Sequence, residues 1–224
     1  MTSPRWPAVI FDLDGTLANT IPLIVASFNH ALATVVGETV PEEVIRSWIG
    51  RPLVETFESW PEQAVELDRI YREWNLANHD DLIEEYAGVP ALLADLASAG
   101  VAMGIVTSKR RETARTALAA VGIAGWVDVV AGLEDTTRHK PRPEPLLLGA
   151  ARLGVQPAAC VYVGDAVVDV QAARAAGMAA VGVTWGAGLI DQLKAAEPDA
   201  LVDDVDALRD LLLGDSLATS PARR

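Results

Sequence analysis

Two pairs of aspartates, each following a short apolar run, are the residues of this chain best suited to chemistry. Asp12 and Asp14 end one run, and Asp165 ends another, with Asp169 four residues further on. Carboxylates gathered in one place repel one another, and their pKa values rise unless a cation compensates the charge. A hard divalent cation with oxygen ligands does this, and Mg²⁺ usually takes only one or two protein carboxylates. The pattern therefore predicts a metal site built for a phosphate.

The four aspartates could divide the work of phosphoryl transfer. Asp12 can attack a phosphorus atom and form an aspartyl-phosphate, and Asp14 would lie near enough to carry a proton to the leaving oxygen. Asp165 could bind Mg²⁺ directly, and Asp169, on the same helix face, could support it. Each residue has a simpler reading, because Asp-x-Asp-Gly is a common turn sequence, Asp165 fits a helix cap and Asp169 fits a surface acid.

Polar and positive groups follow two further segments. Thr107, Ser108 and Lys109 end another apolar run, and Lys140 lies in the basic segment 138–142. Thr107 and the amides beside it could bind phosphate oxygens at the start of the next helix, and Lys140 could neutralise the phosphoryl oxygens. The alternatives are that Thr107 caps a helix and that Lys140 is solvated. Phosphoryl transfer needs mainly positioning and charge stabilisation, and these groups supply both.

The elements that must position these side chains alternate along the chain. Apolar runs of three to six residues alternate with amphipathic stretches, several of which end at glycine. This order predicts a doubly wound α/β fold, a mainly parallel sheet covered on both faces. The expected strands are residues 8–11, 101–106, 127–130, 160–163, 179–183 and 200–202, and the expected helices are residues 89–99, 111–121, 143–153, 167–176 and 189–195. Ligands of such sheets bind beyond the carboxyl ends of the strands.

Residues 18–85 break this alternation. They contain no convincing strand, and helices are expected over residues 21–36, 42–49, 53–58 and 62–85. Inserts at the carboxyl end of a strand tend to border the active site, so we expect a helical cap; the alternative is that the insert only enlarges the core. The expected organisation is an α/β core of residues 1–17 and 86–213, a cap of residues 18–85 and a disordered tail of residues 214–224.

Composition narrows the class of protein. The chain has 224 residues, half of them hydrophobic, which is enough to bury a core. Its net charge of −13 argues against nucleic acid or an anionic membrane as a partner, and no apolar stretch is long enough to span a bilayer. Cys160 is the only cysteine, so no intrachain disulfide forms. A buried Cys160 and a cytoplasmic setting are expected, since no secretory signal is evident.

Four segments of the chain resemble the four motifs of the haloacid dehalogenase superfamily of phosphatases. They are residues 11–17, 106–109, 140–145 and 164–169. The resemblance extends over residues 8–213. The Lys-Pro-x-Pro-x-Pro run and the helical insert are similar to the branch with a small helical cap, which includes phosphoglycolate phosphatases, a pyrophosphatase subgroup and β-phosphoglucomutases.

The resemblance implies a role for each aspartate. Asp12 is expected to be the nucleophile and a Mg²⁺ ligand, and Asp14 the general acid/base, with its backbone carbonyl as a further ligand. Asp165 is expected to bind Mg²⁺, with Asp169 in support. Ala166 departs from the family pattern, because relatives often carry Ser or Thr there, and this puts one hydrogen bond near the metal in doubt.

The resemblance also assigns the groups that hold the substrate. Thr107 and Lys140 are expected to bind the phosphoryl group, with Ser108 and Lys109 as substrate contacts beside them. Residues 48–53 resemble the cap loop that faces the active site in this branch.

Two cap residues bear on the substrate. Arg51 is a candidate to bind a carboxylate or a second phosphate, the alternative being a surface arginine. Asn19, followed by Thr20, is similar to the pyrophosphatase subgroup, whereas phosphoglycolate phosphatases more often have an acid there.

We therefore expect a Mg²⁺-dependent phosphatase that acts, as a monomer or homodimer, on a small phosphorylated metabolite such as 2-phosphoglycolate. Inorganic pyrophosphatase and sugar-phosphate mutase activities are the alternatives. A binding module without turnover would lack one of the catalytic groups, and all of them are present.

Overall fold

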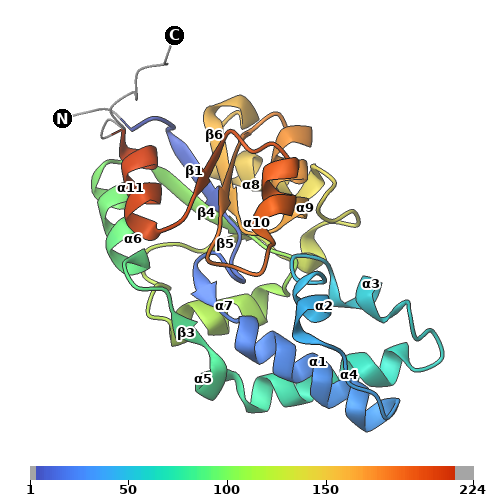
Figure 1. Cartoon of the computed structure of the whole chain (residues 1–224). Helices are drawn as coiled ribbons and strands as arrows, with labels where there is room; N and C mark the ends of the chain where they lie inside the picture. The colour runs from blue at the N-terminus through green and yellow to red at the C-terminus, as the bar shows by residue number, and fades with distance from the viewer. Residues whose placement is uncertain (1–3, 215–224) are drawn as a thin grey trace.

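The core of the molecule is a six-stranded parallel sheet, seen in a computed structural model that describes residues 4–214 (Figure 1). The strands lie in the order β5-β4-β1-β6-β7-β8. Their bounds are β1 Ala8–Phe11, β4 Ala102–Val106, β5 Val129–Ala131, β6 Cys160–Gly164, β7 Ala179–Val183 and β8 Ala200–Val202. Strand β1 is central and pairs with both β4 and β6, so the carboxyl ends of these three strands are neighbours.

Helices cover both faces of the sheet (Figure 1). Alternate residues of β1 face opposite layers: Val9 and Phe11 lie in one apolar cluster, and Ala8 and Ile10 lie in the other. One layer holds α6 Val89–Ser98, α7 Arg111–Ala120 and α11 Val205–Leu213, and the other holds α8 Glu144–Leu153, α9 Val167–Ala175 and α10 Ile190–Ala195. The doubly wound α/β fold predicted from the alternating pattern is confirmed.

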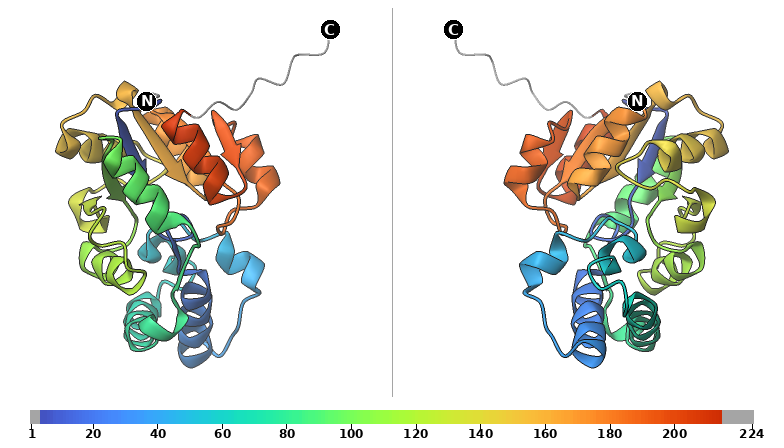
Figure 2. Two further views of the ribbon diagram at one scale, coloured as in Figure 1. Left: turned by 90° about the vertical axis from the view of Figure 1, so that its left-hand side faces the viewer. Right: turned by 90° about the vertical axis from the view of Figure 1, so that its right-hand side faces the viewer.

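A helical unit lies beyond the carboxyl ends of the strands, below the sheet in Figure 2. It has an apolar cluster of its own, centred on the contacts of α1 with α4. The ring of Phe28 lies at its middle, 5.2 Å from Trp48 and 4.8 Å from Tyr71 between centroids, in edge-to-face arrangements. Its helices are α1 Ile21–Val35, α2 Glu42–Arg46, α3 Leu53–Phe57, α4 Ala64–Ala77 and α5 His79–Leu82.

Residues 18–85 differ from the prediction in two respects. The expected absence of strands is wrong, because β2 Ala18–Asn19 pairs antiparallel with β3 Glu84–Glu85. The single helix expected over residues 62–85 is also wrong, since it breaks at Asn78 into α4 and α5 and ends before β3. Two-residue strands show no periodicity, and exposed glutamates suit a helix as well as a ribbon. The ribbon joins the two ends of the cap segment.

Other boundaries bear on the remaining predictions. Helix α11 is not among the predicted helices. It nevertheless has a cap typical of a helix start, because Oδ1 of Asp204 accepts a hydrogen bond from the amide of Ala207 at 2.7 Å. Within residues 4–214, no helix combines the length and apolar character needed to cross a membrane. The tail expected to be disordered lies, beyond Gly214, outside the described residues.

Candidate active site

Three buried aspartates meet at the carboxyl ends of β1 and β6. One carboxylate oxygen from each of Asp12, Asp165 and Asp169 lies within 4.8 Å of the others. The amide of Asp12 donates to the carbonyl of Val163 at 2.8 Å. This bond continues the pairing of β1 with β6 and fixes the position of the Asp12 backbone. Asp169 turns back toward the strand because its Oδ2 accepts the amide of Ala166 at 2.9 Å, at the start of α9.

Lys140 reaches into this cluster from the loop before α8. Its Nζ lies 3.0 Å from Oδ2 of Asp12 and 2.7 Å from Oδ1 of Asp169. It also donates to the hydroxyl of Tyr162 at 3.2 Å, and that hydroxyl donates to the carbonyl of Val106 at 2.9 Å. Burial alone would lower the pKa of Lys140, but the two carboxylates raise it well above its usual value. Lys140 is therefore a buried cation, and the solvated alternative is wrong.

The cluster has the chemistry of a site for a divalent cation. Burial raises the pKa of Asp12 well above its usual value, with Asp169 and Asp165 adding to the rise and Lys140 opposing it. Burial, followed by the charge of Asp169, raises the pKa of Asp165 to about 7. Oδ1 of Asp12 is buried and has no hydrogen-bond partner within the described part of the chain. Carboxylate oxygens whose negative charge is not fully compensated by neighbouring cations are suitable ligands for a hard metal ion.

A glycine allows this close approach. Gly15 has φ of +76°, a conformation that favours glycine, and a Cβ built on it would lie 2.3 Å from Oδ2 of Asp165. The Asp-x-Asp-Gly segment thus forms a turn, as the structural alternative proposed, and the same turn carries the carboxylates of Asp12 and Asp14. The two readings are compatible.

Asp14 lies apart from the three-carboxylate cluster. Its Oδ1 lies 2.9 Å from Nζ of Lys109 and accepts the hydroxyl of Thr20 at 2.6 Å. It faces a cavity of about 310 Å³ between the sheet and the cap, which Asp12 also lines. The metal contact expected of its backbone carbonyl stays a prediction.

The other predicted phosphate contacts lie at the same cavity. Thr107, Ser108 and Lys109 all line it. The Oγ1 of Thr107 accepts the amide of Lys109 at 3.1 Å, and α7 begins only at Arg111, so Thr107 is not the helix cap that its alternative reading proposed. Ser108 donates to the carbonyl of Gly50 at 2.7 Å, which ties the end of β4 to the cap.

The two predicted cap residues are placed differently. Arg51 lines the cavity, and its guanidinium forms no ion pair or hydrogen bond with any residue of the described chain. Asn19 is not among the residues that line it; its Nδ2 donates to Oε2 of Glu84 at 3.1 Å across the β2–β3 ribbon. A direct substrate contact of Asn19 therefore finds no support in this arrangement.

Sequence reasoning missed several groups that shape the site. Tyr162 supports Lys140, and Thr16 donates to Oδ1 of Asp165 at 3.1 Å. Tyr71, Arg72 and Asn75 of α4 line the cavity from the cap. The one available signal was Tyr162, a hydroxyl inside an otherwise apolar strand, because a buried hydroxyl needs a partner.

Comparisons with known proteins agree with this fold. The model of the haloacid dehalogenase-like hydrolase family matches residues 9–183, so the chain belongs to that family. It is 39% identical over 209 residues to "Pyrophosphatase PpaX" of Bacillus velezensis, a match that covers 93% of this chain and 97% of the relative. The expected superfamily and the expected enzyme class, a phosphatase, are confirmed.

Two solved structures illustrate the likeness. A "predicted phosphoglycolate phosphatase" from Haemophilus somnus is 27% identical with a TM-score of 0.80, covering 94% of this chain and 98% of its own. A β-phosphoglucomutase from Clostridium difficile is 25% identical with a TM-score of 0.78, covering 91% of this chain and 93% of its own.

Proposed function

We propose that the protein is a Mg²⁺-dependent phosphatase that hydrolyses a small anionic phosphate compound through an aspartyl-phosphate. The observation that carries the proposal is at Asp12, which lines the cavity: its Oδ2 pairs with Lys140, and its buried Oδ1 has no hydrogen-bond partner among residues 4–214. Asp12 and Asp165 would hold the metal, with Asp169 in support. When bound, Mg²⁺ would neutralise charge on the carboxylates and on the transferring phosphoryl group.

The residues divide the reaction into two halves. In the first, an oxygen of Asp12 bonds to phosphorus, the bond from phosphorus to the leaving oxygen breaks, and Asp14 gives that oxygen a proton. In the second, Asp14 takes the proton back from a water that attacks phosphorus, which releases inorganic phosphate and free Asp12. Lys140 and Thr107 stabilise the phosphoryl oxygens throughout.

For the substrate we propose a phosphate monoester with a second anionic group, of the 2-phosphoglycolate kind. Arg51 supports this choice, since it is an unpaired cation of the described chain on the cap side of the cavity. The second candidate is inorganic pyrophosphate, and the relative of that name, 39% identical, favours it. Both compounds carry a second anionic group near the reacting phosphorus.

Phosphate release from a panel of esters and from pyrophosphate, with and without Mg²⁺, tests the proposal. The protein is expected to release phosphate only with Mg²⁺, and Asp12→Asn only at background rate. A rate for pyrophosphate far below the rates for the esters would rule out pyrophosphate as the substrate. Rates for the esters far below the rate for pyrophosphate would rule out the phosphate monoester. Glucose 1-phosphate, analysed for glucose 6-phosphate, separates mutase activity from hydrolysis.

A further inference from the structure

The loop after β7, residues 184–188, packs closely against Asp165. The amide of Ala187 donates to Oδ2 of Asp165 at 2.7 Å. The backbone comes so near that a Cβ built on Gly186 would lie 2.3 Å from that same oxygen. The loop therefore fixes one oxygen of a proposed metal ligand.

The side chain of Trp185 reaches the other oxygen through one intermediary. Its Nε1 donates to the carbonyl of Thr16 at 3.2 Å, and the hydroxyl of Thr16 donates to Oδ1 of Asp165 at 3.1 Å. Thr16 is buried, which limits the access of water to these bonds. A shift of the indole would move Thr16 and, through it, the carboxylate.

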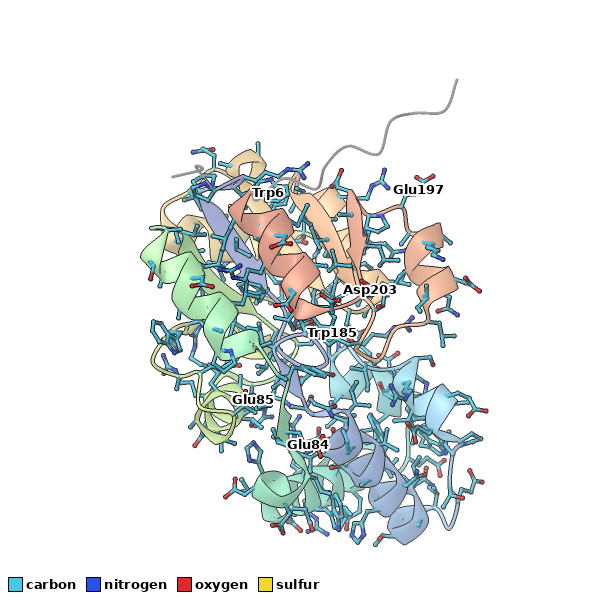
Figure 3. All side chains as sticks on the ribbon, turned by 60° about the vertical axis from the view of Figure 1, so that its left-hand side comes forward. Trp6, Glu84, Glu85, Trp185, Glu197 and Asp203 are labelled. Atoms are coloured by element: carbon cyan, nitrogen blue, oxygen red, sulfur yellow. The ribbon has the colours of Figure 1, made fainter. Side chains whose placement is uncertain are left out.

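The same tryptophan touches the segment that enters the core from the cap. Tyr86 follows β3 directly, and its hydroxyl donates to the carbonyl of Trp185 at 3.4 Å. The two rings meet edge to face, with centroids 6.2 Å apart. Figure 3 shows Trp185 above Glu84 and Glu85, at the level where the core meets the cap. Trp185 thus lies between the connection to the cap and the cluster of aspartates.

We propose that Trp185 is a positioning residue, which orients Asp165 for the metal through Thr16 and couples that orientation to the cap through Tyr86. The inference rests on the proposed function, since it takes Asp165 as a Mg²⁺ ligand. Groups that orient a metal ligand from outside the coordination sphere commonly affect affinity strongly. A purely packing role for the indole is the competing explanation. Trp185→Phe removes the N–H together with part of the ring, so the readout separates the two roles: lost packing lowers the melting temperature without Mg²⁺, whereas the lost N–H raises the Mg²⁺ dissociation constant.

The experiment is a Mg²⁺ titration of the full chain, read by calorimetry and by the rise in melting temperature. For Trp185→Phe we expect the Mg²⁺ dissociation constant to rise about 3- to 10-fold. Turnover should recover at saturating Mg²⁺, with the KM for substrate unchanged. Trp126→Phe is the matched control, because Trp126 is 46% exposed and its indole has no hydrogen-bond partner among residues 4–214; it should bind Mg²⁺ like the wild type.

Tyr86→Phe supplies a second test that does not depend on the folding of the first variant. It removes only the hydroxyl and should raise the Mg²⁺ dissociation constant about 2- to 5-fold. The double variant should bind Mg²⁺ no more weakly than Trp185→Phe alone, since both changes interrupt the same connection from the cap to Asp165. Effects that multiply, or Mg²⁺ binding like the wild type in either single variant, would overturn the inference. If the wild type itself binds no Mg²⁺, the proposed function and this inference fail together; if it binds and the variants bind equally, only this inference fails.

Discussion

The ammonium of Lys140 lies 3.0 Å from the carboxylate of Asp12, and neither side chain is more than 2% exposed. Lys140 also pairs with Asp169, while the charge of Asp165 adds to the negative side of the same cluster. When all three carboxylates are ionised, the one ammonium leaves two negative charges, which is the charge a divalent cation compensates. Lys140 thus reduces the repulsion among the carboxylates when no metal is bound. The negative charge that remains can still attract a metal ion.

Replacing Lys140 with methionine should abolish turnover and destabilise the protein by about 3–5 kcal/mol without Mg²⁺, because it leaves buried carboxylates unpaired. Urea unfolding with and without Mg²⁺ measures the loss, which Mg²⁺ should reduce in part. Lys194→Met, at an exposed lysine of α10, is the control and should change little. Equal stability of Lys140→Met and the wild type would contradict this account of the cluster.

Asp12→Asn should behave in the opposite way towards stability. The change removes one of three mutually repelling charges, so the melting temperature without Mg²⁺ should equal or exceed that of the wild type. Turnover should vanish, and the stabilisation by Mg²⁺ should shrink. Scanning calorimetry with and without Mg²⁺ checks both points, with Asp203→Asn, at an exposed acid, as the comparison. A variant clearly less stable than the wild type in the absence of metal would refute the repulsion argument.

The sequence was sufficient for the sheet and for the convergence of its acids. Apolar runs ending in Asp12, Thr107 and Asp165 are a local pattern, and parallel strands bring their carboxyl ends to one edge whatever their order. Lys140 could be assigned because the motif around it is specific, even though its burial is not visible in a basic run.

What escaped prediction depends on contacts between distant segments. The ion pair of Lys109 with Asp14 and the bond from Ser108 to Gly50 depend on how the cap docks, which no local pattern encodes. The β2–β3 ribbon is held by pairing across 65 residues, as the bond from Asn19 to Glu84 shows, and two-residue strands carry no periodic signal.

Arg51→Ala should raise the KM about tenfold for substrates with a second anionic group, because a charged hydrogen bond is lost, and change kcat less. The KM for p-nitrophenyl phosphate, which has no second anion, should stay the same. Steady-state kinetics on both substrates tests this, and Arg142→Ala, an exposed arginine outside the cavity, is the control. A KM that rises equally for both substrates would show that Arg51 does not bind the second anionic group.

Asp135 provides a prediction for pH, away from the cluster of aspartates. Its carboxylate binds Arg152 at 2.9 Å, Arg111 at 2.5 Å and the amide of Gly132 at 2.8 Å, which joins α7 and α8 to the end of β5. These contacts, that of Arg152 first, lower the pKa of Asp135 to about 2.

The unfolded chain takes up this proton near pH 4, before the folded protein does. The stabilisation by Asp135 is therefore complete above about pH 4 and declines as the pH falls towards 2. Asp135→Asn should be less stable than the wild type at pH 7, and the difference should shrink between pH 4 and pH 3. Urea unfolding across this range measures it, with Asp203→Asn, at an exposed acid, as the comparison variant. A difference that stays constant down to pH 3 would mean that Asp135 stabilises the fold by shape and not by charge.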